Sequence, residues 1–258
     1  MAMKILRFDE INSTNVFLYD KISENNDISD TVVVAAHQTA GRGMGENRWE
    51  SEAGMNLLFS IALNVSFLQA ENQFKISQAV SVAILETLQS ILPSDNFYIK
   101  WPNDIYFGDN KLAGMLIQNT VEGCAMGISV VGIGLNVNQM EFAKDIPNPI
   151  SLKQISGKDF DLDKVLDMLI TNIKKTVESL RFTDSQEEID RKYTAKSYRF
   201  GKWADYFYQN QVKTMIIKGF DKYGRLLLHD KEGTGIVCDV KELRFFPPSC
   251  PQGSEADV

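Results

Sequence analysis

The sequence predicts an α+β protein with one large domain and one small β domain. Segments 74–92 and 162–181 carry apolar residues at the spacing of amphipathic helices. Short apolar or β-branched runs between turn residues fill much of the remaining chain and are typical of strands. Near Gly201 the pattern changes to short β segments alone. We therefore expect a domain boundary there, with domains at 1–198 and 199–246.

The elements of the large domain follow in order along the chain. Ser13, Thr14 and Asn15 are good N-cap residues for a helix through Tyr19. The β-branched run 31–36 predicts a buried strand. Further strands are expected at 55–65, 97–99, 105–107, 111–117 and 130–138.

Three helices complete the large domain. Helix 74–92 places its apolar residues on one face, which we expect to face the core. Asp161 is a suitable N-cap for helix 162–181, and the charged stretch 183–196 is expected to be helical. The remaining face of helix 162–181 is charged and should be solvated.

The end of the chain predicts a small β domain. Strands are expected at 212–220, 225–228 and 235–240, separated by turns at 221–224 and 231–233. The polar, proline-rich tail 247–258 is expected to be disordered.

Composition excludes several classes of protein. The 258 residues are 44% hydrophobic and can supply a substantial core. With 27 Lys and Arg against 34 Asp and Glu, the net charge is -7, which argues against general nucleic-acid binding. No stretch approaches the roughly 20 apolar residues of a spanning helix, and no signal peptide is recognisable. We expect a cytoplasmic protein without a membrane partner.

Cysteine and histidine give no sign of a metal site. Cys124, Cys238 and Cys250 are widely spaced without a CxxC pair, so we expect reduced, structural cysteines. His37 and His229 lie far apart in the sequence. His37 precedes a glycine-rich loop, where a hydrogen-bonded structural role is favoured over ligand contact.

The segment 41–49, Gly-Arg-Gly-Met-Gly-Glu-Asn-Arg-Trp, combines a flexible backbone with two guanidinium groups and an indole ring. Glycine lets a backbone approach a ligand closely, and arginine offers a planar fork of donors that suits phosphate or carboxylate. The segment follows the predicted strand 31–36, at a sheet edge. An anionic ligand is indicated, the alternative being a surface turn.

Further polar clusters occur at the ends of strands. Residues 100–104, Lys-Trp-Pro-Asn-Asp, bring a cation, an aromatic ring, an amide and a carboxylate to one chain reversal. A second lysine, Lys111, begins the return strand. The apolar strand 130–138 is interrupted by two glycines, which favours a closely approaching ligand or a bulge.

These motifs together resemble the biotin protein ligases. The resemblance rests on Ser13-Thr14-Asn15, the Gly-Arg-Gly loop ending in Trp49, Lys-Trp-Pro-Asn-Asp, Lys-Leu-Ala-Gly and Gly-Ile-Gly-Leu-Asn-Val-Asn, in the family's order. It covers residues 5–138 and is weaker beyond them. It implies a class II synthetase-like mixed sheet with flanking helices for the biotin- and ATP-binding domain, followed by a small SH3-like β-barrel.

The resemblance also implies a two-step, ATP-dependent reaction. Biotin is activated as biotinyl-5'-AMP with release of pyrophosphate, and is then transferred to a lysine of a biotin carboxyl carrier protein or carboxylase domain. Because one anion must attack another, the site needs fixed positive charge. Arg42 and Lys111 are the predicted catalytic cations. Asp104 is the third catalytic candidate, to orient a lysine, activate the acceptor amine or contact the Mg²⁺ expected with ATP.

The same resemblance implies two sets of binding residues. The biotin set is Ser13, Thr14, Asn15, Gln38, Gly41, Arg42, Gly43, Met44, Lys111 and Gly114. The ATP set is Arg48, Trp49, Lys100, Asn103 and Asn136. Trp49 would stack on adenine, unless it is a plain core aromatic, and Lys100 could equally be a solvated strand end. The loop is expected to be mobile when empty and to close over ligand.

Two features depart from the resemblance. Many family members have arginine where this chain has Met44, so we hypothesise faster release of biotinyl-AMP, unless Arg48 compensates. Some members also carry an N-terminal helix-turn-helix domain that represses transcription. Because Ser13 lies near the start of this chain, we expect neither that domain nor DNA binding.

Alternative functions remain open at this point. A lipoate or octanoate transferase would share the fold and the acyl chemistry. A non-catalytic biotin or nucleotide sensor would have no need of both Arg42 and Lys111, and the acidic balance disfavours a generic RNA-binding protein. The carrier and the oligomeric state are also open, since a free sheet edge could pair two monomers or dock the acceptor.

Overall fold

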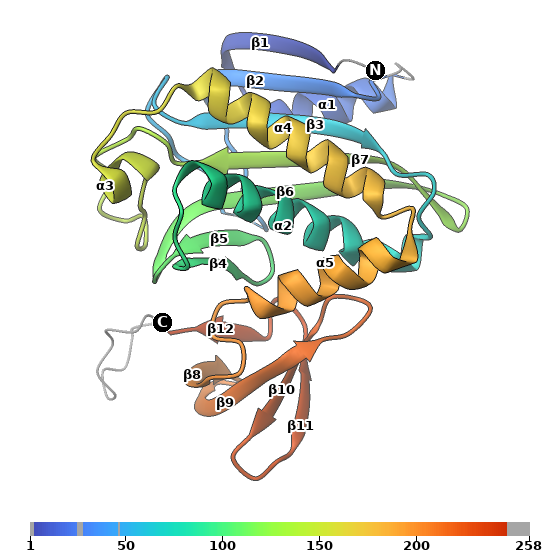
Figure 1. The fold of residues 1–258 in the computed structure, drawn as a ribbon, viewed down its shortest axis with the longest axis vertical. Helices are drawn as coiled ribbons and strands as arrows, with labels where there is room; N and C mark the ends of the chain where they lie inside the picture. The colour runs from blue at the N-terminus through green and yellow to red at the C-terminus, as the bar shows by residue number, and fades with distance from the viewer. Residues whose placement is uncertain (1–2, 25–27, 46, 247–258) are drawn as a thin grey trace. The chain divides into compact units, whose positions relative to one another are not determined.

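The computed structural model describes residues 3–24, 28–45 and 47–246 of the chain. It divides into two compact units, Met1–Tyr198 and Arg199–Val258. The first unit is built on a seven-stranded mixed sheet in the order β1-β2-β3-β7-β6-β5-β4 (Figure 1). The predicted α+β class, with helices flanking a mixed sheet, is confirmed.

The large sheet contains one strand that the sequence pattern did not predict. Its strands are β1 (Lys4–Ile11), β2 (Thr31–Gln38), β3 (Leu57–Asn64), β4 (Phe97–Lys100), β5 (Asp104–Phe107), β6 (Asn110–Glu122) and β7 (Ala125–Leu135). The unpredicted β1 lies at the sheet edge and pairs in parallel with β2, whereas the other neighbours are antiparallel. Its residues are mostly exposed, so it lacks the apolar pattern of a buried strand.

The predicted helices are present with small shifts at their ends. They are α1 (Thr14–Ser23), α2 (Phe74–Ile91), α4 (Leu162–Ser179) and α5 (Thr183–Ala195), accompanied by the short α3 (Leu152–Ser156) and a 3₁₀ turn, η1 (Ala70–Asn72). Ser13 caps α1, which continues to Ser23 instead of ending at Tyr19. Asp161 caps α4 as predicted, accepting hydrogen bonds from two backbone amides.

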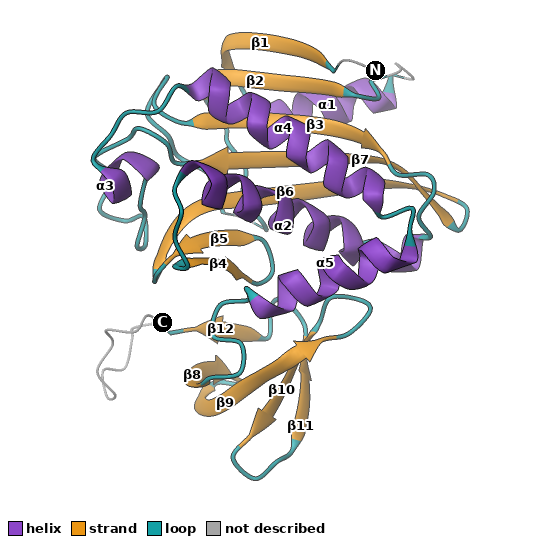
Figure 2. Cartoon of the chain, in the orientation of Figure 1, coloured by secondary structure: helices purple, strands orange, loops and turns teal. Residues whose placement is uncertain are grey.

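Helices cover both faces of the sheet. Leu18 of α1 packs with Val33, Ala62 and Val130 on one face, and α1 lies behind the sheet in Figure 2, whereas α4 lies in front. On the front face α4 is joined to α2 by a hydrogen bond from Asn172 Nδ2 to the Ala83 carbonyl (3.1 Å). Side chains alternate along a strand, so residues 130, 132 and 134 of β7 lie on the same face of the sheet. This is the face that α1 covers.

The second unit is a five-stranded antiparallel sheet. Its strands are β8 (Trp203–Tyr208), β9 (Gln211–Phe220), β10 (Leu226–Asp230), β11 (Gly235–Cys238) and β12 (Leu243–Phe245), in the order β11-β10-β9-β8-β12. The three predicted strands correspond to β9, β10 and β11, while β8 and β12 were missed. The sheet buries Tyr206, Met215 and Leu228. Among the described residues β11 and β12 are the sheet edges, and closure into an SH3-like barrel stays a prediction.

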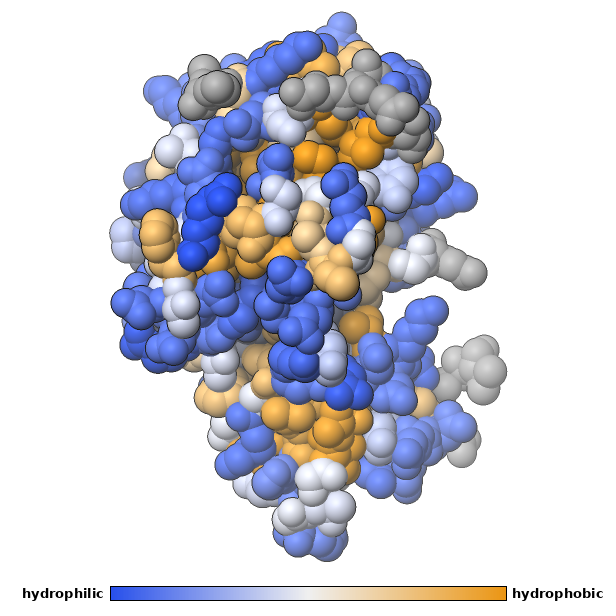
Figure 3. Space-filling model, turned by 90° about the vertical axis from the view of Figure 1, so that its right-hand side faces the viewer, coloured by the Kyte–Doolittle hydropathy of each residue, from blue (hydrophilic) through white to orange (hydrophobic). Residues whose placement is uncertain are grey.

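The surface of the second unit includes apolar area, visible in Figure 3, and this unit carries the exposed Trp203 and Val212.

The cysteines differ in burial. Cys238 is buried, and burial raises the pKa of its thiol to about 11, so it is a thiol rather than a reactive thiolate at neutral pH. Cys124 is exposed. Cys250 and the tail 247–258 lie outside the described residues. In the part of the chain that is described, no helix has the length and apolarity needed to cross a membrane.

Candidate active site

The predicted site residues from four separate segments meet on the α1 face of the large sheet. Gln38 at the end of β2 accepts hydrogen bonds from Thr14, both from its backbone nitrogen (2.7 Å) and from its hydroxyl (3.1 Å). Asn15 Nδ2 donates to the carbonyl of Leu116 in β6 (3.0 Å). A Cβ added to Gly132 of β7 would lie 2.6 Å from Asn15 Nδ2. The start of α1 is therefore fixed against three strands.

A buried cluster of polar side chains forms around the N-terminus of α1. Ser13, Thr14 and Asn15 are all at least 96% buried, and the Thr14 hydroxyl lies 2.8 Å from Ser60 Oγ of β3. Asn15 Oδ1 is buried without a hydrogen-bond partner among the described residues. An unpartnered buried acceptor is costly, so a ligand N–H that reached it would be strongly favoured. The cluster suits a small polar ligand that carries both donors and acceptors.

The glycine-rich loop 41–49 folds back on itself as a short hairpin. Gly43 N donates to Asn47 O (2.8 Å), and Trp49 N donates to Gly41 O (3.1 Å). A Cβ on Gly41 would lie 2.4 Å from the carbonyl oxygen of Trp49, so only glycine fits there. Glu46 lies outside the described residues.

This hairpin places two arginines opposite each other. Arg42 and Arg48 form an antiparallel bridge, and both are exposed. Like charges directly opposite across a bridge repel, and an anion between the two guanidinium groups would relieve this repulsion. Among the described residues neither guanidinium has a carboxylate partner. The loop is therefore suited to bind phosphate or carboxylate.

Trp49 lies across glycines of two neighbouring strands. A Cβ on Gly134 would be 2.3 Å from Trp49 Cε2, and one on Gly114 would be 3.0 Å from Cζ3. The indole is half-buried, and its Nε1 has no hydrogen-bond partner among the described residues. Gly134, one of the two glycines that interrupt the apolar strand 130–138, thus makes room for the indole together with Gly114 of β6.

A cation stands beside this wall. Lys111 Nζ lies 5.6 Å from the centroid of the Trp49 ring and 2.8 Å from Asp104 Oδ1. The Lys111 and Asp104 side chains are 32% and 15% exposed. The ammonium is thus oriented by a carboxylate yet open to a ligand.

A β-bulge brings Lys111 onto this face. Asp104 pairs with Gly114, and Tyr106 with Lys111, so the register shifts between Ile105 and Tyr106. Asp104 and Tyr106 share one face because side chains alternate along β5. Without the shift, Lys111 and Gly114 would lie on opposite faces of the sheet.

The comparisons with known proteins agree with this geometry. A profile of the biotin/lipoate A/B protein ligase family matches residues 7–137, which include the loop, Lys111 and both wall glycines. The chain belongs to this family.

Relatives within the family are similar over most of the chain. The bifunctional ligase/repressor BirA of Escherichia coli is 30% identical over 237 residues, which cover 88% of this chain and 68% of BirA. The biotin--[acetyl-CoA-carboxylase] ligase of Mycobacterium tuberculosis is 27% identical over 237 residues, 90% of this chain and 86% of the relative. The solved structure of the biotin protein ligase from Aquifex aeolicus in complex with biotin and ATP aligns with a TM-score of 0.76 at 28% identity, covering 94% of this chain and 99% of that one. The resemblance seen in the motifs is confirmed.

Three residues of the predicted ATP set are engaged within the protein. Lys100 Nζ donates to the Tyr106 hydroxyl (2.9 Å). Asn103 Nδ2 donates to Met115 O (2.7 Å), and Asn136 Nδ2 donates to Ile150 O (3.1 Å). These amides hold strands and loops around the site, and their contact with a nucleotide stays a prediction. His37 Nδ1 lies 3.0 Å from Glu10 Oε2, in keeping with the hydrogen-bonded role favoured for it.

Sequence reasoning missed a supporting network under the site. Asn56 Nδ2 and Gln139 Oε1 are hydrogen-bonded at 2.5 Å, and Val137 N donates to Asn56 Oδ1 (2.8 Å). Asn56 and Gln139 are both buried. Their bonds tie the segment before β3 to the segment after β7. An asparagine just before an apolar strand was the only local signal.

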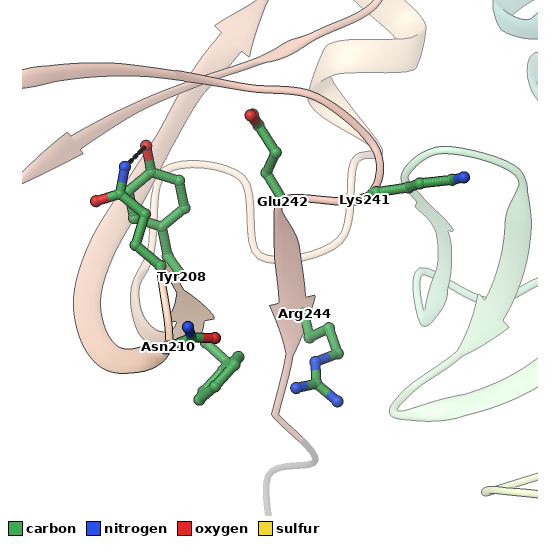
Figure 4. A pocket seen from close by; sticks show the side chains of 7 residues that line it. Tyr208, Asn210, Lys241, Glu242 and Arg244 are labelled. Carbon is green, nitrogen blue, oxygen red and sulfur yellow. Dashed lines mark hydrogen bonds between the residues drawn. The ribbon is translucent and has the colours of Figure 1, made fainter. Parts of the chain in front are cut away.

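A pocket of about 430 Å³ lies in the second unit (Figure 4). Its lining residues are Phe207, Tyr208, Gln209, Asn210, Lys241, Glu242 and Arg244. Gln209 Nε2 donates to the Tyr208 hydroxyl (3.1 Å), and Arg244 lies 4.6 Å from the Phe207 ring centroid. The pocket contains none of the site residues predicted from sequence.

Proposed function

We propose that this chain is a biotin protein ligase, which activates biotin with ATP as biotinyl-5'-AMP and transfers the biotinyl group to a lysine of a biotin carboxyl carrier protein. The observation that carries the proposal is the position of Lys111. Its ammonium lies 2.8 Å from Asp104 and 5.6 Å from the Trp49 ring. It stands on the sheet face that also holds the buried polar cluster of Asn15, so a carboxylate ligand and a nucleotide can meet there.

In the first step an oxygen of the biotin carboxylate forms a bond to the α-phosphorus of ATP, and the bond to pyrophosphate breaks. We assign Arg42 to the carboxylate and the phosphate, and Lys111 to the charge that gathers on the α-phosphoryl oxygens. Fixed cations of this kind offset the repulsion between two anions without having to reorganise during the reaction. Trp49 would hold adenine by stacking.

In the second step the amine of the acceptor lysine attacks the carbonyl carbon of the mixed anhydride, AMP leaves, and the amine loses a proton. Asp104 already holds Lys111 through a 2.8 Å ion pair, so we assign it first to orienting that lysine. As a second role we propose that its carboxylate accepts the proton of the acceptor amine.

Biotin's ureido ring is assigned to the buried polar cluster at the start of α1. The Asn15 Oδ1 acceptor, which is buried and unpartnered among the described residues, can receive a ureido N–H. The Ser13 hydroxyl, which only accepts a hydrogen bond within the helix cap, can donate to the ureido oxygen, and the Thr14 hydroxyl, which donates to Gln38, can accept from a ureido N–H. Their backbones are already fixed by the helix cap and by Gln38, so binding needs little further ordering.

The described residues do not form a magnesium site of their own. They contain no group of three or more His, Cys, Asp or Glu side chains that could hold a metal ion, and Asp104 is engaged by Lys111. Mg²⁺ keeps much of its water and is often held by substrate phosphates. We propose that it arrives with ATP, and we assign no step to it.

The transfer activity is tested with purified protein, ATP, Mg²⁺, biotin and a biotin carboxyl carrier protein. The expected result is the gain of one biotinyl group by the carrier, seen by intact-mass spectrometry, with none on a carrier whose acceptor lysine is changed to arginine. An unmodified carrier after prolonged incubation would contradict the proposal.

Met44 gives a prediction about release of the intermediate. Its side chain is half-buried in the loop and has no donor to offer an acyl-adenylate. Met44→Arg adds a charge-assisted contact of roughly 1.5–3 kcal/mol, so dissociation of biotinyl-AMP should slow by about tenfold or more. Stopped-flow chase experiments measure this rate. Met140→Arg, at a 51% exposed methionine, is the matched control. An unchanged rate in Met44→Arg would remove the hypothesis.

A further inference from the structure

The turn that leads into Lys111 is held by a residue far away in the sequence. Asp109 sits between β5 and β6, two residues before Lys111. The Tyr198 hydroxyl donates to Asp109 Oδ1 at 2.5 Å. From the other side, Asn148 Nδ2 donates to the Asp109 carbonyl oxygen. One side-chain bond and one backbone bond thus fix the position of the turn.

Tyr198 is itself held rigidly. Its backbone nitrogen donates to Ile99 O of β4 (2.8 Å), and the side chain belongs to a residue that is only 7% exposed. Its ring centroid lies 5.4 Å from that of Tyr106 and 6.2 Å from that of Tyr98. Tyr106 is the residue opposite Lys111 in the β5–β6 register. Tyr198 therefore contacts both the turn and the strand that faces Lys111.

The backbone of Lys111 depends on the same region. Lys111 N donates to Asn148 O (2.7 Å), and Ile150 N donates to Lys111 O (3.0 Å). Asn148 thus holds both Asp109 and Lys111. If the turn loses its bond to Tyr198, the Asp109 side chain loses this anchor, and the turn keeps only the bond from Asn148 to the Asp109 carbonyl and the backbone bond from Gly108 N to Asn96 O (2.8 Å). Because Lys111 immediately follows the turn and adjoins a β-bulge, its ammonium is expected to shift or to become less ordered.

We propose that Tyr198 is a positioning residue for adenylation, which acts through Asp109 to hold Lys111 in place. The inference rests on the proposed function, since it concerns the reaction assigned to Lys111. Tyr198 touches neither substrate in this assignment. It stabilises the geometry of the turn, and through it the alignment of the ammonium with the transferring phosphoryl group. Misplacement of a catalytic group by about 1 Å can lower a rate by roughly a hundredfold.

The test compares single-atom deletions in the same aromatic cluster. Tyr198→Phe removes only the hydroxyl that binds Asp109. Tyr98→Phe is the matched control, because its ring adjoins Tyr198 while the bond to Asp109 Oδ1 comes from the Tyr198 hydroxyl. In biotin-dependent pyrophosphate exchange, Tyr198→Phe should lower kcat by about tenfold with KM for biotin and ATP within about twofold, and Tyr98→Phe should match the wild type.

Variants of Asp109 provide an independent measurement. Asp109→Ala, at an exposed position, should reproduce the kcat loss of Tyr198→Phe, and the double variant should be no worse than either single one. Asp109→Asn keeps an acceptor oxygen for the Tyr198 hydroxyl and should retain most of the activity. If Tyr198→Phe does not fold, the comparison of Asp109→Ala with Asp109→Asn still tests the proposal.

The outcomes separate the two proposals. A wild-type protein without biotin-dependent exchange would refute the proposed function. An active wild type with Tyr198→Phe and Asp109→Ala equal to Tyr98→Phe would overturn the inference alone. So would a rise in KM at unchanged kcat, because it would assign Tyr198 to ligand binding instead of the positioning of Lys111.

Discussion

Replacing Lys111 with alanine should lower kcat for biotin adenylation by on the order of a hundred- to a thousandfold, the range seen when a preorganised charge or donor is lost from a transition state. Its ammonium lies 5.6 Å from the centroid of the Trp49 ring and is held there by Asp104 at 2.8 Å. Binding of biotin should change far less, since the buried polar cluster around Asn15 stays intact. Pyrophosphate exchange measures the rate, and calorimetry measures biotin affinity.

The matched control for this variant is Lys153→Ala. Lys153 also forms an ion pair, with Asp159 at 2.7 Å, but it lies in α3 at the surface. Its replacement should leave exchange unchanged. If Lys111→Ala exchanged pyrophosphate at the wild-type rate, Lys111 would have no role in the reaction. A different cation would then be favoured.

Adding one methyl group at Gly134 or at Gly132 of β7 should raise the KM for a different substrate in each case. A Cβ at Gly134 would lie 2.3 Å from Trp49 Cε2, so Gly134→Ala must displace the indole and should raise KM for ATP by at least about tenfold. A Cβ at Gly132 would lie 2.6 Å from Asn15 Nδ2 and 3.3 Å from Ser60 Oγ. Gly132→Ala should therefore raise KM for biotin by a similar factor.

Gly127→Ala controls for the general effect of a methyl group in this strand. Its Cβ would also be crowded, at 2.5 Å from the Thr120 hydroxyl, but it meets none of the proposed ligand contacts. This variant should lose stability without a selective change in either KM. If Gly132→Ala and Gly134→Ala raised the two KM values equally, the separate assignment of Asn15 and Trp49 would be wrong.

The sequence was sufficient to predict the elements that have strong local patterns. The apolar stripes of α2 and α4, the cap at Asp161 and the turn chemistry of the second unit all act within a few residues. The edge strand β1 was missed because it is mostly exposed and lacks a buried run. The glycines of β7 were correctly singled out as interruptions, but that Trp49 and Asn15 fill the space above them depends on tertiary packing.

Side-chain contacts between distant residues could not be predicted from local patterns. The face on which Lys111 lies is decided by a β-bulge, a shift of one residue that leaves no periodic signal. Asp109 and Tyr198 are 89 residues apart, and neither belongs to a recognised motif. Conversely, Asn136 belongs to a motif, and its amide is engaged with the Ile150 carbonyl. A motif identifies residues near a site without giving the partner of each one.

Biotin-dependent exchange of pyrophosphate into ATP tests the central claim most directly, because it reports formation of the acyl-adenylate without any carrier protein. The protein is incubated with ATP and Mg²⁺ and with biotin, lipoate or octanoate in parallel. Exchange with biotin alone is the predicted result. Exchange with lipoate or octanoate in place of biotin would contradict the assigned substrate, and absence of exchange with all three would contradict the assignment of Arg42 and Lys111 to catalysis.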